Sequence, residues 1–125
     1  MNNDPRITRL IERKSRLIAK LIQLDAAMKL MIQETHLEEL NRAVQKQEQC
    51  ITETEQLTRE LLDLFNSGNW SDHQIQTLKD QDREWKQYLE QTSQTRHQLE
   101  SLLKNMKDRA NRKNIRNKIN STYRW

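Results

Sequence analysis

Apolar residues recur every three or four positions over three long stretches of the chain, a pattern typical of amphipathic helices. Asp4 and Pro5 precede the first stretch and favour a helix start, because Asp accepts backbone N–H bonds at an N-cap and Pro tolerates the first helical turn. The pattern therefore predicts a helix over about residues 5–33. Its stripe consists of Ile7, Leu10, Lys14, Leu17, Leu21, Leu24, Met28 and Met31, widened by Ile11, Ile18 and Ile32.

A second stripe predicts a helix over about residues 36–66. Thr35 and Glu38 match a capping box, which favours a tight turn before this helix. One helix running straight through is the alternative, since neither Gly nor Pro interrupts the chain here. The centre of the stripe is polar, which predicts weak packing. Its apolar members are Leu37, Leu40, Val44, Ile51, Leu57, Leu61, Leu64 and Phe65, and its polar members are Gln47, Cys50 and Thr54.

The segment between residues 66 and 72 contains the clearest loop signal, Asn-Ser-Gly-Asn-Trp-Ser-Asp. Gly68 suits a left-handed position after a helix end, and Ser71 or Asp72 can cap the next helix. The third helix is predicted over about residues 72–103, with a continuation beyond. Its predicted seam consists of Ile75, Leu78, Trp85, Leu89, Leu99, Leu103, Met106 and Ala110, with Asp82 as a charged member and Trp85 as a core residue.

The charge of the chain divides it into two parts. Residues 1–103 carry 14 basic and 17 acidic side chains, whereas residues 104–125 carry eight basic side chains and one acid. The fold class expected is all-α: an antiparallel three-helix bundle or coiled-coil hairpin over residues 1–103, with a long third helix. Residues 104–125 are expected to form a basic C-terminal helical arm or tail that overhangs, bends or folds back.

Composition narrows the class of protein further. One Gly, one Pro and 34% apolar residues among 125 suit a thin helical bundle and disfavour a sheet protein. Cys50 is the lone cysteine, the N-terminus does not resemble a signal peptide, and no apolar run is long enough to span a membrane. We therefore expect a cytoplasmic protein without a transmembrane span.

The polar residues do not suggest catalysis or a metal site. The three histidines, His36, His73 and His97, are far apart in sequence, and one cysteine cannot build a zinc framework. The carboxylates near residue 82 alternate with Lys and Arg, as on a solvated helix face. Asp82 lies on the predicted seam, and we expect it to pair with Lys14 or Arg59. We expect no enzyme and no cofactor.

Four segments resemble the small flagellar export chaperones of the FliT and FlgN group. Residues 28–40 are similar to the helix end, short turn and Leu-Glu-x-Leu start of that family, and residues 45–51 resemble its Glu- and Gln-rich second helix. Residues 75–84 look like its Ile-x-x-Leu run followed by Asp and charged pairs, and the basic end with Tyr123 resembles its C-terminus. The first turn lacks the Gly-Asp or Gly-Asn step often found in the family.

The resemblance implies a cytoplasmic chaperone that binds an amphipathic helix of a flagellar cap or hook-associated protein and keeps it soluble and monomeric until export. Export-apparatus components are further expected partners. A client helix would lie between helices two and three, where we expect opening near Gln47, Thr54, Thr92 and Arg96. The expected client-binding residues are Leu57, Leu61, Leu64, Phe65, Ile75, Leu78, Trp85 and Leu89.

The basic arm has a separate expected role. The resemblance implies that it folds back and competes with the client for the same groove. The residues expected to act in this regulation are Met106, Arg109, Arg112, Lys113, Arg116, Ile119 and Tyr123.

Two other classes of function remain open from the sequence. The chain could be a structural coiled-coil protein that forms homo-oligomers through its first helix, or a helical nucleic-acid-binding protein that uses the basic tail. The oligomeric state, monomer or homodimer, does not follow from the pattern.

Overall fold

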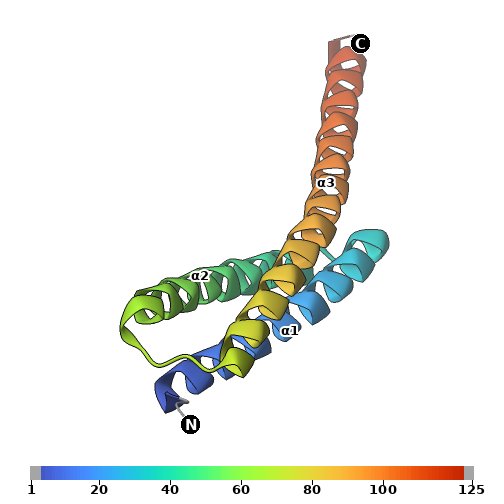
Figure 1. Ribbon diagram of the computed structural model, residues 1–125. Helices are drawn as coiled ribbons and strands as arrows, with labels where there is room; N and C mark the ends of the chain where they lie inside the picture. Colours follow the sequence, from blue (N-terminus) through green and yellow to red (C-terminus); the bar gives the residue numbers. More distant parts are fainter. Residues whose placement is uncertain (1–3, 123–125) are drawn as a thin grey trace.

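Three helices make up the protein in the computed structural model, which describes the backbone of residues 4–122 and the side chains of residues 4–112. Helix α1 spans Pro5–Glu34, α2 spans Leu37–Ser67 and α3 spans Asp72–Thr122 (Figure 1). Residues 4–122 contain no strand. The prediction of an all-α three-helix bundle is confirmed.

Helix α1 is the central element of the bundle, because it packs against both other helices. α1 and α2 form an antiparallel hairpin, and α3 runs in the same general direction as α1 (Figure 1). Among the described residues, α2 and α3 make no close backbone approach to one another and meet through side chains. The face between them is therefore the open side of the bundle.

The buried positions follow a strict heptad pattern in each helix, as in a coiled coil. In α3 the buried residues Gln74, Gln81, Tyr88 and Thr95 come seven positions apart. The predicted α3 seam is only partly right: Leu78, Trp85 and Leu99 are half-buried against the core clusters, whereas Leu89 and Leu103 are exposed. The apolar pattern did not predict the fully buried row of α3, because most members of that row are polar.

The buried row of α1 differs in part from the predicted stripe. It consists of Ile7, Ile11, Lys14, Ile18, Leu21, Asp25 and Met28, so Ile11 and Ile18, expected only to widen the stripe, are core residues. The centre of α2, which the sequence predicted to pack weakly, is buried. Its polar residues Gln47, Cys50 and Thr54 are all buried, and they contribute to the core with Leu40, Ala43, Leu57 and Leu61.

Three apolar clusters, separated by polar layers, form the core. The first cluster is centred on Ile7, Ile11 and Leu61, and it includes Trp70 and Leu78. The second joins Leu21 and Cys50 to Tyr88, and the third joins Met28 to Leu40 and Ala43. Trp85 packs half-buried on the second cluster, in agreement with its predicted place in the core.

The turn between α1 and α2 occurs at the predicted position, but the end of α1 forms it and not a capping box at the start of α2. Thr35 adopts the left-handed conformation, with φ 59° and ψ 39°, and closes α1. The His36 N–H donates to the carbonyl of Met31 at 2.9 Å, as in a Schellman-type helix end. His36 is the N-cap of α2 and makes no side-chain capping bond. The predicted Thr35–Glu38 capping box is therefore wrong.

The loop before α3 is held by capping and by close packing. Ser71 and Gln74 form a reciprocal capping box, with bonds of 3.0 and 3.1 Å between each backbone N–H and the other side chain. Gly68 is extended (φ −100°), so its predicted left-handed conformation is wrong. Glycine is still required, because a Cβ there would lie 2.9 Å from the carbonyl oxygen of Leu64 and 3.0 Å from Ile7.

Helix α3 continues without a break through the predicted boundary at residue 103. Its C-terminal part runs beyond the α1–α2 hairpin as a single rod (Figure 1). Leu99 packs on the third core cluster, whereas residues 107–112 are exposed. In the described chain the basic arm is thus a helical overhang.

Candidate functional site

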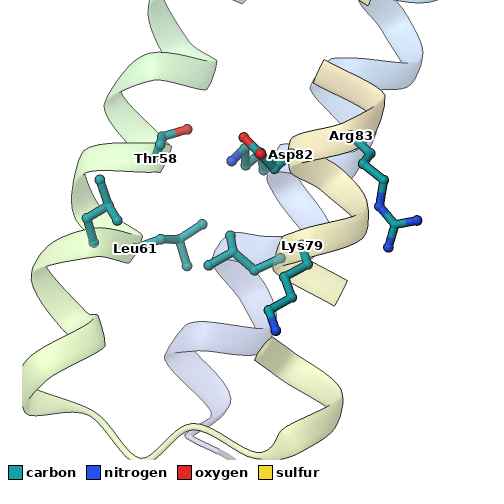
Figure 2. Close-up of a pocket in the computed structure, with 8 residues that line it drawn as sticks. Thr58, Leu61, Lys79, Asp82 and Arg83 are labelled. Carbon is teal, nitrogen blue, oxygen red and sulfur yellow. The ribbon is translucent and has the colours of Figure 1, made fainter. Parts of the chain in front are cut away.

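The open side of the bundle contains a groove between the end of α2 and the beginning of α3 (Figure 2). Its cavity volume is about 560 Å³, within the range of roughly 300–1,000 Å³ common for binding sites. Three helices contribute to its walls and floor. The lining residues are Lys14 from α1, Thr58, Leu61 and Leu62 from α2, and Leu78, Lys79, Asp82 and Arg83 from α3.

The apolar part of the groove is an outward extension of the first core cluster. Leu61 is buried and Leu78 is half-buried in that cluster, whereas Leu62 is 59% exposed. Helical spacing places Leu62 and Phe65 on one side of α2, since they are three residues apart. Phe65 is also half exposed and contacts Trp70, with 5.5 Å between the ring centroids. These side chains give α2 an apolar rim.

The α3 wall of the groove is charged. Figure 2 shows Asp82 directed toward the gap that Thr58 faces from α2, and Arg83 pointing away from it. The Asp82 carboxylate forms an ion pair with Lys86 on the same helix, with 3.0 Å between Asp82 Oδ2 and Lys86 Nζ. The expected pair with Lys14 or Arg59 is not formed, because no ion pair within 4.0 Å joins Asp82 to either residue in the described structure.

Lys14 lies at the floor of the groove and is only 5% exposed. Burial lowers the pKa of its ammonium below the ordinary value, because desolvation penalises the charged form, and the negative charge of Asp82 opposes this shift. Among residues 4–112, its Nζ has no hydrogen bond or ion pair within the usual distances. The cavity therefore contains a partly desolvated cation beside leucine side chains.

A polar layer limits the groove toward the middle of the bundle. The Gln47 side-chain amide donates to the hydroxyls of Tyr88 at 2.8 Å and Thr92 at 2.7 Å. Burial raises the pKa of the Tyr88 hydroxyl, which these hydrogen bonds partly oppose, so the group stays neutral at physiological pH. Gln47 thereby joins α2 directly to α3. This link closes the bundle at the layer where the sequence suggested an opening.

The structure brings together only part of the predicted client-binding set. Leu61 and Leu78 line the groove, and Leu64 and Phe65 lie on the neighbouring turn of α2. Leu57 is a core residue, Ile75 and Trp85 are half-buried outside the cavity lining, and Leu89 is 43% exposed farther along α3. The sequence reading missed Lys14, Thr58, Leu62, Lys79 and Arg83 as groove residues.

One signal for the groove was present in the sequence. Lys14 interrupts an otherwise apolar stripe, and a lone cation at a core heptad position often has a specific role. Leu62 could not be recognised, because it falls outside the apolar stripe of α2. Its place in the groove depends on the separation of α2 from α3.

The predicted regulatory residues that the structure describes lie on the overhang of α3, away from the groove. Met106 is half-buried, and Arg109 and Arg112 are exposed. Lys113, Arg116 and Ile119 belong to the helix, but their side chains lie outside the described residues, as does Tyr123 altogether.

The described residues do not form a metal site, because no group of three or more His, Cys, Asp or Glu side chains among them is arranged to hold a metal ion. None of the helices in this part of the chain combines the length and apolar character that crossing a membrane requires. Comparisons with protein-family models, with curated proteins and with solved structures give no match.

Proposed function

We propose that this protein is a chaperone that holds an amphipathic helix of a protein client in the α2–α3 groove. The observation that carries the proposal is the open side of the bundle, where α2 and α3 separate above a floor that includes Leu61 and Leu78. An amphipathic helix inserts its apolar face into such a groove through residues spaced i, i+3, i+4 and i+7. Its place would resemble that of a fourth helix in a bundle.

Binding here protects the client by burying its apolar stripe. An isolated amphipathic helix exposes leucine-rich surface that favours aggregation, and burial contributes about 25 cal/mol for each Å² removed from water. Leu62 and Phe65 on the α2 rim offer further apolar contact area. The resemblance to the FliT and FlgN group suggests the client class: a flagellar cap or hook-associated protein, held in the cytoplasm before export.

Co-purification with defined clients tests this proposal. The full chain, Leu62→Glu and Leu30→Glu are each co-expressed with flagellar cap and hook-associated proteins and analysed by size-exclusion chromatography. Leu30 is the matched control, because it is also 59% exposed but lies on α1 outside the groove lining. We expect a complex that Leu62→Glu weakens at least tenfold and Leu30→Glu leaves intact. Failure of every candidate client to bind would contradict the flagellar assignment.

The basic overhang is proposed to regulate client binding. In the described structure the arm extends away from the groove, so gating requires α3 to bend (Figure 1). A chain ending at residue 103 should bind the client more tightly than the full chain if the arm competes. Unchanged affinity would contradict gating and leave the groove proposal intact.

The exposed charge of the overhang favours nucleic-acid binding as a second candidate function. Lys104, Lys107, Arg109 and Arg112 are all exposed, on a part of α3 where every side chain of residues 107–112 is exposed. Oligonucleotide affinity that falls steeply with salt and disappears on deletion of residues 104–125 would support this function. Weak, salt-insensitive binding would exclude it.

A further inference from the structure

Lys14 occupies an unusual position for a lysine without an ionic partner. It lies in the buried heptad row of α1, in a layer adjoining the first core cluster, yet its side chain also lines the groove. The groups nearby on the other helices are the Thr58 hydroxyl and the Leu61 side chain on α2, and Lys79 and Asp82 on α3. Among them only Asp82 is anionic, and it is 59% exposed and paired with Lys86.

The groove allows this arrangement because it is open to solvent. Water in the cavity can accept hydrogen bonds from the Lys14 ammonium, which has three donors and no protein acceptor in the described structure. The ammonium keeps contact with solvent although the residue as a whole is only 5% exposed, because Lys14 Nζ is not one of the fully buried polar atoms that lack a partner in the described structure. The lowered pKa of Lys14 is consistent with a cation that is already partly desolvated.

A helix that covers the groove would remove this water. If the covering face were wholly apolar, the Lys14 ammonium would be buried without a partner, which is strongly unfavourable. A carboxylate on the covering face would instead pair with it, and a pair excluded from water is stronger than one at the surface. The exposed Lys79 on the rim adds positive potential and favours the same sign of charge in the occupant.

We propose that Lys14 determines the specificity of the groove: the client helix that fits carries one Asp or Glu within its apolar stripe, and this carboxylate pairs with the Lys14 ammonium. The inference rests on the proposed helix-binding function and adds the chemistry of the client. Leu61, Leu62 and Leu78 contact the leucines that flank the carboxylate, and Lys14 selects the register of the helix. A helix with a wholly apolar stripe is disfavoured, because it would bury the Lys14 ammonium without a partner.

The test uses the full chain and a series of labelled helical peptides of about 18 residues. All peptides share one leucine stripe. They come in pairs that differ at a single stripe position, which is Glu in one peptide and Gln in the other, and each pair places this position at a different point along the stripe. Fluorescence anisotropy at nanomolar peptide, where the peptides do not pair with one another, measures each affinity. At one position we expect the Glu peptide to bind about tenfold more tightly than its Gln partner, as for close charge pairs at interfaces.

Two variants assign this preference to Lys14. Lys14→Met should remove the preference for Glu while the Gln peptide still binds, and Asp82→Asn should change the preference less than about twofold. Circular dichroism and a cooperative urea transition verify that both variants are folded. A preference for the Glu peptide that survives Lys14→Met overturns the inference. A preference that appears only in Asp82→Asn also overturns it, because this result would mean that Asp82 already neutralises Lys14.

The remaining outcomes separate this inference from the proposed function. If Glu and Gln peptides bind equally at every position and Leu62→Glu abolishes both, the groove binds helices without selecting a carboxylate. In that case the Lys14 inference is wrong and the helix-binding function stands. If no peptide of the series binds the wild-type chain, both are contradicted.

Discussion

Most polar side chains in the core have definite hydrogen-bond partners. The Gln81 amide donates to the carbonyl of Ile11 at 2.7 Å and to the hydroxyl of Ser15 at 2.6 Å, and the Thr54 hydroxyl donates to the carbonyl of Cys50. Gln74 similarly ties α3 to the start of α1 through the carbonyl of Asp4. At the residue scale, these bonds fix the register of the helices, because a shift by one residue would leave buried donors unpaired.

Gln47→Ala should destabilise the protein by about 2–4 kcal/mol. The substitution removes two buried hydrogen bonds, to Tyr88 and Thr92, and leaves a cavity where the side chain is now 1% exposed. Urea denaturation followed by circular dichroism measures the change. Gln49→Ala, on the exposed face of the same helix, is the control and should change stability by less than about 0.5 kcal/mol. Equal effects for the two variants would contradict the importance of the polar layer.

Lys14→Met should stabilise the chain by about 1 kcal/mol or more at neutral pH. It replaces a buried cation without an ionic partner by an apolar side chain of similar length. The folded-state pKa of Lys14 lies below its unfolded value of 10.5, so the cost of burying the charge is present at neutral pH and disappears as pH rises past that value. Denaturation at pH 7 and near pH 11 should therefore show a gain that shrinks with pH. A destabilised variant at pH 7 would contradict this account.

At the element scale, each helix end has a local cause. Asp4 caps α1 by accepting the Arg6 N–H at 3.0 Å, and Ser71 caps α3. These two starts were predicted from sequence, because capping depends on residues only two or three positions apart. The role of Thr35 at the end of α1 was not predicted from sequence. Threonine also suits an N-cap, and the observed left-handed helix end requires packing of α2 against α1.

Thr35→Gly should stabilise the α1–α2 turn by roughly 1 kcal/mol. A β-branched residue at φ 59° is strained, whereas glycine adopts this conformation freely, and the helix-end bonds to Ile32 and Met31 use backbone atoms alone. The midpoint of thermal or urea unfolding measures the gain. Loss of stability would instead indicate that the Thr35 side chain contributes a contact that outweighs the strain.

At the scale of the whole molecule, the three helices divide the chain into a packed bundle and an overhang. The heptad row of α1 is covered by α2 and α3, with Ile7, Ile18 and Leu21 fully buried. A covered seam does not favour self-association through α1, which is the route that the homo-oligomer alternative requires. Exposed apolar residues remain on all three helices. Leu62 and Phe65 lie in or beside the groove, whereas Ile22, Leu30, Leu37, Leu89 and Leu103 lie outside its lining.

Deleting residues 107–125 should leave the bundle intact. The described side chains at the start of this segment, residues 107–112, are exposed and make no core contact, so the free energy of unfolding should change by less than about 0.5 kcal/mol. Urea denaturation of the truncated and full chains provides the comparison. A loss above about 2 kcal/mol would show that the arm packs against the bundle.

The sequence alone determined the three helices, their approximate ends and the division between a nearly neutral bundle and a basic arm. These features depend on local periodicity, on capping residues and on the distribution of charge, all of which are readable within a few turns. Even the position of Lys14 within an apolar stripe was visible in this way.

Only the tertiary structure decided which row of α1 and of α3 is buried. In α1 two adjacent apolar rows compete, one through Ile11 and Ile18 and the other through Leu10 and Leu17, and the neighbouring helices select the first. In α3 the selected row contains Gln74 and Gln81, whose side-chain N–H groups donate to partners on α1. The separation of α2 from α3, and hence the groove above Lys14, follows from these long-range contacts. It could not be predicted from sequence, because the spacing of residues within one helix carries no information on its distance from another.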